Sequence, residues 1–321
     1  MVAKLTDVAK LAGVSPTTVS RVINKKGYLS EKTIQTVQDA MKTLGYKPNS
    51  LARGLQGKPA QLVGLIFPSV KHIFFAELID ALEKELFQNG YKTIICNSEN
   101  DIAKEKEYLE MLSANQVDGI ISSSHNLDVD DYHHVSAPII SFDRNLAPDI
   151  CVVSSDNFSG GQLAAQTLLA AHCKKPIIIT GSDNSNSPTG NRQKGFSSIL
   201  PDAPVYKLSS NYSPARKQME IKTILTNAKC DAIFTTDDLT ALLVLKVADQ
   251  LGLAIPKDIK LIGYDGTAFI ENFVPHLTTI QQPIHEMAKL MVDLLIKKMN
   301  HEKLAQRCYE LPIKLIAGKT V

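Results

Sequence analysis

Cysteines are few in this chain, and none is spaced for pairing with another. The five are Cys96, Cys151, Cys173, Cys230 and Cys308. An odd and scattered set without a Cys-x-x-Cys pair argues against a disulfide framework and a zinc site, and indicates a reducing compartment. His133 and His134 are neighbours, which is not the i, i+4 spacing of a helical metal site. We therefore expect no bound metal.

Long apolar runs are also missing. No stretch approaches the roughly 20 residues of a membrane-spanning helix, and the chain opens without the apolar region of an export signal. No low-complexity segment or internal repeat is visible. With 321 residues, of which 44% are hydrophobic, the chain suits two or three packed units. We expect a cytoplasmic globular protein with no membrane partner.

The sequence shows no catalytic arrangement either. Asp237 and Asp238 are adjacent, so their side chains should diverge and make a poor acid–base pair. Gly160-Gly161 lacks the GxGxxG spacing of a dinucleotide site. We therefore predict that the chain is not an enzyme and uses no cofactor.

What the chain does have is an uneven distribution of charge. Its net charge is +2, but residues 1–59 contain ten Lys and Arg against three Asp and Glu. This basic head has an excess of seven positive charges, so the remainder carries a net charge of −5. Because cationic side chains replace the counterions of DNA, a basic head suits binding to a phosphate backbone.

The head contains the stretch Leu5 to Asn24, LTDVAKLAGVSPTTVSRVIN, which predicts two short helices joined by a tight turn. Thr6 is a candidate N-cap, and Gly13 can end the first helix in a left-handed conformation. The predicted apolar stripe of this helix is Val8, Ala9, Leu11 and Ala12. Ser15 is a second N-cap, with Pro16 at the first helical position. A third helix should begin after Ser30 and end at Gly45. Its predicted apolar face is Ile34, Val37, Met41 and Leu44.

The second of these helices has the composition of a DNA-reading element. Val19, Val22 and Ile23 form an apolar face, which turns the polar side chains outward. Arginine can donate two hydrogen bonds to a guanine edge, and hydroxyl or amide groups can reach phosphates. The other interpretation is an ordinary solvated helix face. The candidate DNA contacts in the head are Thr6, Ser15, Pro16, Thr17, Thr18, Ser20, Arg21, Asn24 and Tyr28.

A proline-bracketed segment follows the head, YKPNSLARGLQGKP, with room for one or two helical turns capped by Asn49. A helix this short is marginal alone, so it should fold only against a partner. Leu55 could wedge into a minor-groove step of DNA, or it could dock on the domain that follows.

From Gln61 onward, apolar runs alternate with amphipathic helices. The predicted strands are LVGLIF, TIIC, GIIS and PIISF, then PIIIT, AIFTT and KLIGY. Predicted helices in the second series lie near residues 158–172, 188–200, 213–227 and 237–251. Such alternation favours two parallel α/β units. A last helix, 284–299, and a strand near 309–315 should return to one of these units; which one is left open.

Polar residues follow these strands, where parallel sheets bind ligands. Carboxylates and amides suit a hydroxyl-rich ligand, although each could instead cap a loop. Phe75 and Tyr212 could cover a sugar or belong to the core. Arg192 could bind hydroxyls or a phosphate. The candidate strand-end residues are Ser69, Ser122 to His125, Asp143, Arg144, Asn184, Ser185, Asp237, Asp238 and Asp265.

Six motifs, in this order, resemble the lactose/galactose repressor family (LacI/GalR) over nearly the whole chain. They are LTDVAKLAGVSPTTVSRVIN, YKPNSLARGLQG, SSDNFSGGQLAA, TTDDLTAL, LIGYDGTAF and LTTIQQP. The segments GIISSSHNLDVDDY and IISFDRNLAP look most like those of regulators of sucrose operons in Gram-positive bacteria. The resemblance implies an all-α helix-turn-helix head and a two-lobed, periplasmic-binding-protein-like α/β core.

The resemblance also implies a division of the chain. The head would span residues 1–47, a hinge helix and linker 48–60, and the effector-binding and dimerisation core 61–321. Lobe 1 would take about 61–157 with the C-terminal return, and lobe 2 about 158–282. A homodimer would read a near-palindromic operator with its paired heads, while the hinge helices lie in the minor groove.

Carried over by position, Pro16, Thr17 and Arg21 fall at base-reading sites, Ala52 at the contact between hinges and Leu55 at the intercalating leucine. In the core the same comparison implies effector contacts. Together with the strand-end analysis, the effector candidates are Ser69, Phe75, Ser124, Asp143, Arg192, Tyr212, Asp237, Asp265 and Gln282.

The sequence departs from the family pattern at three places. Pro16 can make only apolar contacts with the operator, and Pro68 stands where some relatives have a serine near the ligand. The leucine heptads of tetramerising relatives are missing, which favours a dimer.

The function we expect is repression of a carbohydrate operon, most consistent with sucrose, relieved by a sugar or sugar phosphate. A regulator that gains DNA affinity on binding an effector or a protein partner is the main alternative. A sugar-binding receptor without a regulatory role is a weaker one, because it should carry an export signal and lack the basic head.

Overall fold

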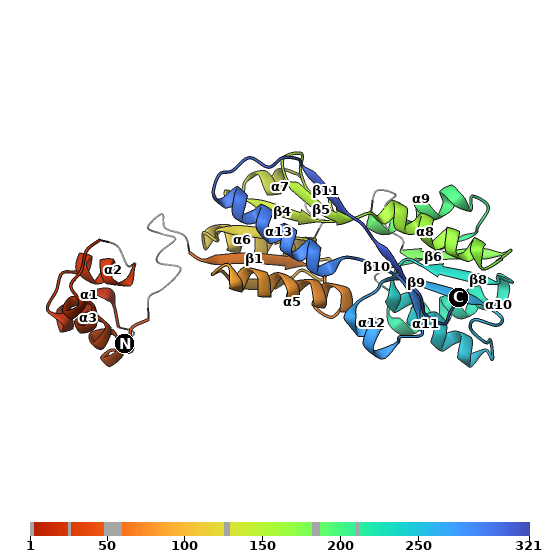
Figure 1. Ribbon diagram of the computed structural model, residues 1–321, viewed down its shortest axis with the longest axis horizontal. Coiled ribbons are helices and arrows are strands. Elements are labelled where there is room, and N and C mark those ends of the chain that lie inside the picture. Colours follow the sequence, from red (N-terminus) through yellow and green to blue (C-terminus); the bar gives the residue numbers. More distant parts are fainter. Residues whose placement is uncertain (1–2, 25–26, 48–59, 125–128, 182–186, 210–211) are drawn as a thin grey trace. The chain divides into compact units, whose positions relative to one another are not determined.

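The computed structural model describes residues 3–24, 27–47, 60–124, 129–181, 187–209 and 212–321. The chain forms two compact units, Met1–Ala60 and Gln61–Val321 (Figure 1). The first unit is helical, and the second contains two sheets covered by helices. This is the fold class that the sequence predicts, a helical head followed by a two-lobed α/β core.

The head consists of α1 (Leu5–Ala12), α2 (Pro16–Ile23) and α3 (Glu31–Thr43). Val8, Val19 and Val37, one from each helix, are fully buried and form its centre. Gly13 ends α1 with a φ of 65°, and the Thr18 backbone N–H donates to Ser15 Oγ at 3.1 Å. The predicted turn and second N-cap are therefore confirmed.

Two details of α1 differ from the prediction. Thr6 is not its N-cap, because the N-cap is Lys4, two residues earlier, whose backbone N–H donates to Asp7 Oδ2 at 2.8 Å. Leu11, predicted on the apolar face, is 53% exposed. Val8, Ala9 and Ala12 share a narrow arc of the helix, and the position of Leu11 lies at the edge of that arc, toward solvent.

The core unit has two lobes, each built on one sheet. Lobe 1 contains a parallel sheet in the order β11-β5-β4-β3-β1-β2. Its strands are β1 (Leu62–Phe67), β2 (Lys92–Asn97), β3 (Gly119–Ser122), β4 (Ile139–Phe142), β5 (Cys151–Ser155) and β11 (Cys308–Leu311). Its helices are α5 (Ile73–Gln88), α6 (Ile102–Ala114), α7 (Val129–His133) and α13 (Ile284–Met299). Helices α5 and α13 cover one face (Figure 1).

Lobe 2 contains a sheet in the order β12-β10-β9-β8-β6-β7, in which β12 pairs antiparallel with β10. Its strands are β6 (Pro176–Gly181), β7 (Val205–Leu208), β8 (Ala232–Thr235), β9 (Lys260–Asp265), β10 (Thr278–Gln281) and β12 (Lys314–Ile316). Its helices are α8 (Asn157–Ala170), α9 (Pro188–Ile199), α10 (Pro214–Asn227), α11 (Asp238–Gln250) and α12 (Ala268–Phe273). Helices α8 and α9 pack on one face, and α10 and α11 on the other.

The chain passes between the lobes after β5, after β10 and between β11 and β12. The last long helix, α13, therefore returns to lobe 1. The strand predicted near 309–315 is wrong as a single element, because Pro312 separates β11 in one sheet from β12 in the other. Proline has a fixed φ and lacks the N–H that a strand donates to its neighbour. It therefore suits a position where the chain leaves one sheet for the other.

Helices α8 and α9 touch backbone to backbone. A Cβ on Gly161 would lie 2.0 Å from the Arg192 carbonyl oxygen, and one on Gly195 would lie 1.9 Å from the Phe158 carbonyl oxygen. Gly160-Gly161, which lacks dinucleotide-binding spacing, is thus a packing element. The close approach fixes the part of α9 that carries Arg192 against α8.

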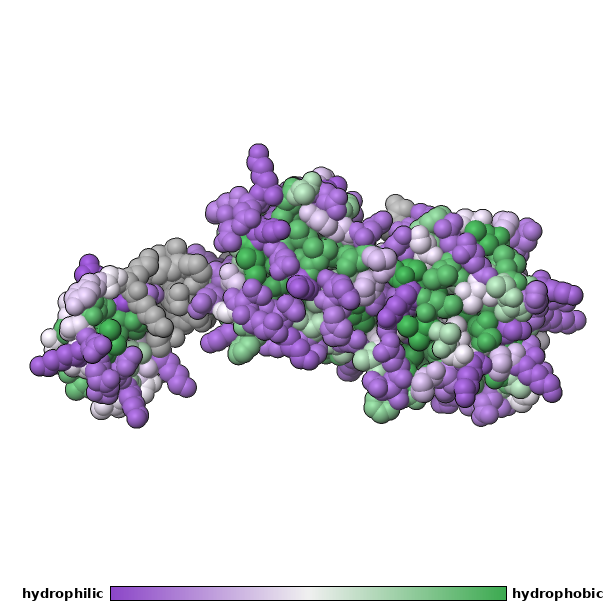
Figure 2. Space-filling view, viewed as in Figure 1, coloured by the Kyte–Doolittle hydropathy of each residue, from purple (hydrophilic) through white to green (hydrophobic). Residues whose placement is uncertain are grey.

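In the view of Figure 2, the surface of the core unit alternates between hydrophilic side chains and sizeable apolar areas. Among the helices within the described ranges, none combines the length and apolarity needed to cross a membrane.

Candidate functional site

The exposed face of α2 presents the predicted DNA-reading residues. Pro16, Thr17 and Arg21 are all exposed, and Thr17 and Arg21 lie one helical turn apart. Val19 and Val22 face the head's core, so this orientation of α2 is fixed by packing. The structure therefore brings the three predicted base readers to one accessible face.

Other candidates in the head already form hydrogen bonds within α2. Ser15 Oγ lies 2.9 Å from Thr18 Oγ1, and Asn24 Nδ2 donates to the Ser20 carbonyl oxygen at 2.6 Å and to Ser20 Oγ at 3.2 Å. These four side chains therefore stabilise the ends of the helix.

The remaining DNA-contact candidates have no such role. Thr6 lies in the exposed first turn of α1, and the Tyr28 side chain is fully exposed. Three predicted DNA contacts lie outside the described residues: Asn49, Ala52 and Leu55.

In the core, a chain of hydrogen bonds joins the lobes where the polypeptide crosses between them. Ser155 Oγ, at the end of β5, donates to Gln282 Oε1 at 2.7 Å. Gln282 Nε2 donates to Asp265 Oδ1, at the end of β9, at 2.8 Å. Arg192 Nη1 lies 3.5 Å from the same carboxylate oxygen. One line of polar contacts thus runs from lobe 1 into lobe 2.

The line returns to lobe 1 through Asn157. Arg192 Nε donates to Asn157 Oδ1 at 2.7 Å, and Asn157 Nδ2 donates to Asp143 Oδ1, at the end of β4, at 3.0 Å. We call this set the cross-lobe network: Asp143, Ser155, Asn157, Arg192, Asp265 and Gln282. It contains four of the predicted effector contacts.

Arg192 is the centre of this network and is only 5% exposed. Its Nη1 also donates to the Thr236 carbonyl oxygen at 2.6 Å, and its guanidinium lies 3.8 Å from the centre of the Tyr264 ring. A buried guanidinium needs such complete pairing because desolvation of a charge is costly. Its position is therefore fixed before any ligand arrives.

Burial shifts the pKa values of the carboxylates in this region upward. The pKa of Asp143 is raised to about 6, chiefly by burial and against the attraction of Arg192. Burial also raises the pKa of Asp265. Both residues have positive φ, 60° for Asp143 and 120° for Asp265. Such strained backbone in non-glycine residues concentrates at functional sites.

Asp237 and Asp238 diverge as predicted. Asp237 caps α11, accepting from the Thr240 N–H at 2.7 Å and from Thr240 Oγ1 at 2.8 Å. Asp238 is completely buried, accepts from Thr279 Oγ1 and the Gly266 N–H at 2.7 Å each, and has a pKa raised to about 7 by burial. Asp238 therefore belongs to the interior, whereas Asp237 is half-buried.

The other predicted effector contacts have varied surroundings. Ser69 Oγ accepts from the Lys71 N–H at 3.1 Å. Ser124 is fully buried and shares a hydrogen bond of 2.6 Å with Ser98 Oγ, so it offers no exposed surface.

The two aromatic candidates differ in exposure. Phe75 is half-buried, with its ring 5.9 Å from that of Phe67. Tyr212 is 40% exposed, with the Arg216 guanidinium 5.6 Å from its ring centre.

Ser155, Asn157 and Tyr264 were missed as site residues. Ser155 ends β5, whose short sequence CVVSS does not by itself predict a strand, so the strand-end pattern does not identify Ser155. Asn157 lies two residues after Ser155, within the motif SSDNFSGGQLAA. Tyr264 was assigned only to the strand KLIGY, yet its ring packs on Arg192.

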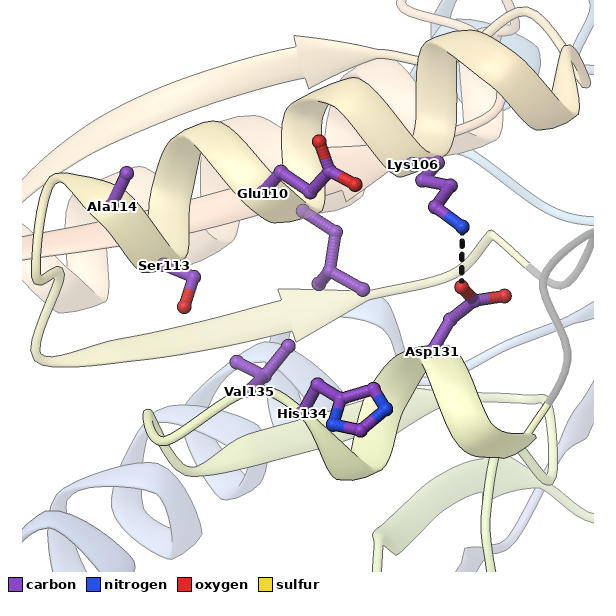
Figure 3. Close-up of a pocket in the computed structure, with 8 residues that line it drawn as sticks. Lys106, Glu110, Ser113, Ala114, Asp131, His134 and Val135 are labelled. Carbon is purple, nitrogen blue, oxygen red and sulfur yellow. Dashed lines mark ion pairs between the residues drawn. The ribbon is translucent and has the colours of Figure 1, made fainter.

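A separate pocket of about 440 Å³ lies on lobe 1 between α6 and the segment containing α7 (Figure 3). Lys106 pairs with Asp131 across it at 3.1 Å, and Leu109 and Val135 contribute apolar surface. None of the predicted effector contacts lines it. Within the described ranges, no cluster of three His, Cys, Asp or Glu side chains could hold a metal ion.

Comparisons with known proteins match both units. Residues 4–49 match the family described as bacterial regulatory proteins, lacI family, and residues 165–321 match the periplasmic binding protein-like domain. The chain is 64% identical over 321 residues to the sucrose operon repressor of Streptococcus mutans, covering 100% of both proteins.

Two solved structures of transcriptional regulators share the fold of this chain over nearly its whole length. The lac repressor dimer bound to operator and the anti-inducer ONPF is 25% identical, with a TM-score of 0.85 over 100% of this chain and 99% of that one. The complex of the transcriptional regulator CelR with cellobiose is 26% identical, with a TM-score of 0.70 over 99% of this chain and 100% of that one.

The raised pKa of Asp143 predicts a measurable effect of pH on stability. Because this carboxyl has a pKa of about 6 in the folded protein and an aspartate ordinarily has a pKa of 3.8, the folded state binds the proton more tightly than the unfolded state. The folded state should therefore gain stability as the pH falls from about 7 to about 5, by roughly 1–3 kcal/mol from this group, and lose it as the pH rises again. Urea unfolding at several pH values measures the change.

Asp143→Asn is the matched variant, because an amide retains an acceptor for Asn157 and does not titrate. Asp238 and Asp265 still titrate in this variant, so its stability should change less steeply with pH than that of the wild type. Parallel pH profiles for the two proteins would contradict the assignment.

Proposed function

This chain belongs to the LacI family of bacterial regulatory proteins, and from that premise we propose that it represses an operon for sucrose utilisation. As a member of the family it is a DNA-binding transcriptional regulator, not an enzyme. The observation that carries the finer proposal is the 64% identity, over the full length of both chains, to a protein named sucrose operon repressor. Such a repressor acts on DNA in the cytoplasm.

We propose that two copies of the chain read a near-palindromic operator. Residues 1–47 would supply the head, 48–60 the hinge and 61–321 the core. The exposed Pro16, Thr17 and Arg21 of α2 would contact base edges, with Arg21 the residue able to donate two hydrogen bonds to guanine. Leu55 would enter the minor groove between half-sites.

The effector would be a sugar or sugar phosphate bound between the lobes. Asp143, Asp237 and Asp265 supply carboxylate oxygens that accept from hydroxyl groups, while Arg192 and Gln282 supply donors. Phe75 and Tyr212 are the aromatic surfaces available to a sugar ring. A mixture rich in acceptors suits a ligand rich in hydroxyl groups.

The cross-lobe network offers a physical route from ligand to DNA. It ties the ends of β4 and β5 in lobe 1 to Asp265 in lobe 2. A sugar whose hydroxyls hydrogen-bond with these groups stabilises one arrangement of the lobes over another. Sugar binding can then change operator affinity only as far as the sugar binds the two arrangements with different affinities.

Arg21 tests the DNA half of the proposal. With an operator recovered by selection from random DNA, Arg21→Ala should lose affinity equivalent to about 1–3 kcal/mol per half-site in gel shifts. Arg21→Lys keeps the positive charge but loses the planar guanidinium that donates two hydrogen bonds at once. This variant should therefore still bind DNA non-specifically and lose its preference for the selected sequence. Wild-type preference in both variants would show that this helix face is only solvated surface.

A panel of ligands tests the effector half. Fluorescence anisotropy of labelled operator should show the protein released by sucrose, its phosphate or one of their component sugars, with operator affinity falling about tenfold or more. Maltose and lactose serve as controls of similar size. A gain in operator affinity with any of these would instead identify a corepressor-dependent regulator, and no response to any of them would remove the proposed effector class.

A further inference from the structure

His72 stands at the point where lobe 1 meets lobe 2. It is the N-cap of α5 and follows β1, an interior strand whose carboxyl end opens toward the ligand side of the sheet. The next residue, Ile73, packs against the apolar cluster of lobe 2. Glu77, one turn further along α5, accepts from the Ala268 N–H of lobe 2 at 2.8 Å. This end of α5 therefore spans both lobes.

The His72 imidazole has an unsatisfied nitrogen. Its ring packs against Phe75, a predicted effector contact, with ring centres 5.3 Å apart. Nδ1 is shielded from solvent and has no hydrogen-bond partner in the part of the chain that the structure describes. Buried polar atoms are almost always paired in folded proteins, and an unpaired one destabilises the state that contains it. A hydrogen-bond donor or acceptor from a bound ligand would remove that cost.

The charges that act on His72 come from lobe 2. They belong to Asp237 at the start of α11, Lys217 of α10 and Arg192 of α9. Burial lowers the pKa of His72 and outweighs the opposing effect of Asp237. The imidazole is therefore neutral near pH 7, with one nitrogen that donates and one that accepts. This is the chemistry of a partner for a hydroxyl group.

From this geometry we propose that His72 is a ligand-contacting residue whose Nδ1 hydrogen-bonds a hydroxyl of the bound sugar. The inference rests on the proposed function, since it takes the cleft ligand to be a sugar. Pairing with the ligand satisfies a nitrogen that the described residues leave unpaired. A site that pairs a buried polar atom in this way rejects ligands without the matching hydroxyl, so His72 would also determine specificity.

His72→Phe tests the assignment, because it keeps an aromatic ring against Phe75 and removes both nitrogens. Calorimetry with sucrose and with sucrose 6-phosphate should show binding weakened about tenfold, the contribution of one ordinary hydrogen bond. Operator affinity without sugar should be unchanged. The thermal midpoint of the free protein should be equal or higher, since an unpaired buried nitrogen has been removed. His134→Phe, at an exposed histidine beside the lobe 1 pocket, is the matched control and should leave sugar binding unaltered.

Equal sugar affinity in wild type and His72→Phe would overturn the proposal. If the wild type binds neither compound, the proposed effector is wrong. The assignment of His72 is then tested by comparing the thermal midpoints of the wild type and His72→Phe without sugar. A fall of several degrees in His72→Phe would show that Nδ1 is paired within the protein, which also overturns the assignment. An unchanged or higher midpoint supports it.

Discussion

The core depends on one buried positive charge that must be fully paired. Arg192 is held by Asp265, by Asn157, by the Thr236 carbonyl and by the face of Tyr264. Because a buried guanidinium without partners would cost several kcal/mol, every one of these groups is constrained in position. The close contact of α8 with α9, which only glycine permits at positions 161 and 195, places the arginine among them.

This constraint has a consequence for the relation between the lobes. Asp143 and Ser155 belong to lobe 1, Arg192 and Asp265 to lobe 2, and Asn157 and Gln282 lie at or beside the crossing strands. Two of the groups that pair the arginine, Asn157 and Asp265, therefore also take part in the hydrogen bonds that join the lobes. A ligand that exchanges hydrogen bonds with them acts on the lobe arrangement directly, without a separate transmission pathway.

Much of this could be predicted from sequence, because local chemistry determines it. Gly13, Ser15 and Pro16 define the turn of the head, and the apolar runs define the central strands. The strand-end rule located Asp143 and Asp265, while the family resemblance was needed for Gln282. Thr6 is not the N-cap, because Lys4 takes that position two residues earlier and its N–H donates to Asp7. Short strands such as CVVSS and TTIQ contain too many polar residues to be recognised, which hid Ser155 and its hydrogen bond to Gln282. The unpaired state of His72 depends on tertiary packing and has no sequence signal.

We propose that sugar and operator bind to different arrangements of one protein. Reciprocal linkage tests this most directly, by calorimetric titration of sucrose into the free protein and into the protein saturated with operator. The predicted result is weaker sucrose binding in the operator complex, by the same factor by which saturating sucrose weakens operator binding. Identical sucrose dissociation constants in the two titrations would show that the two sites are not linked.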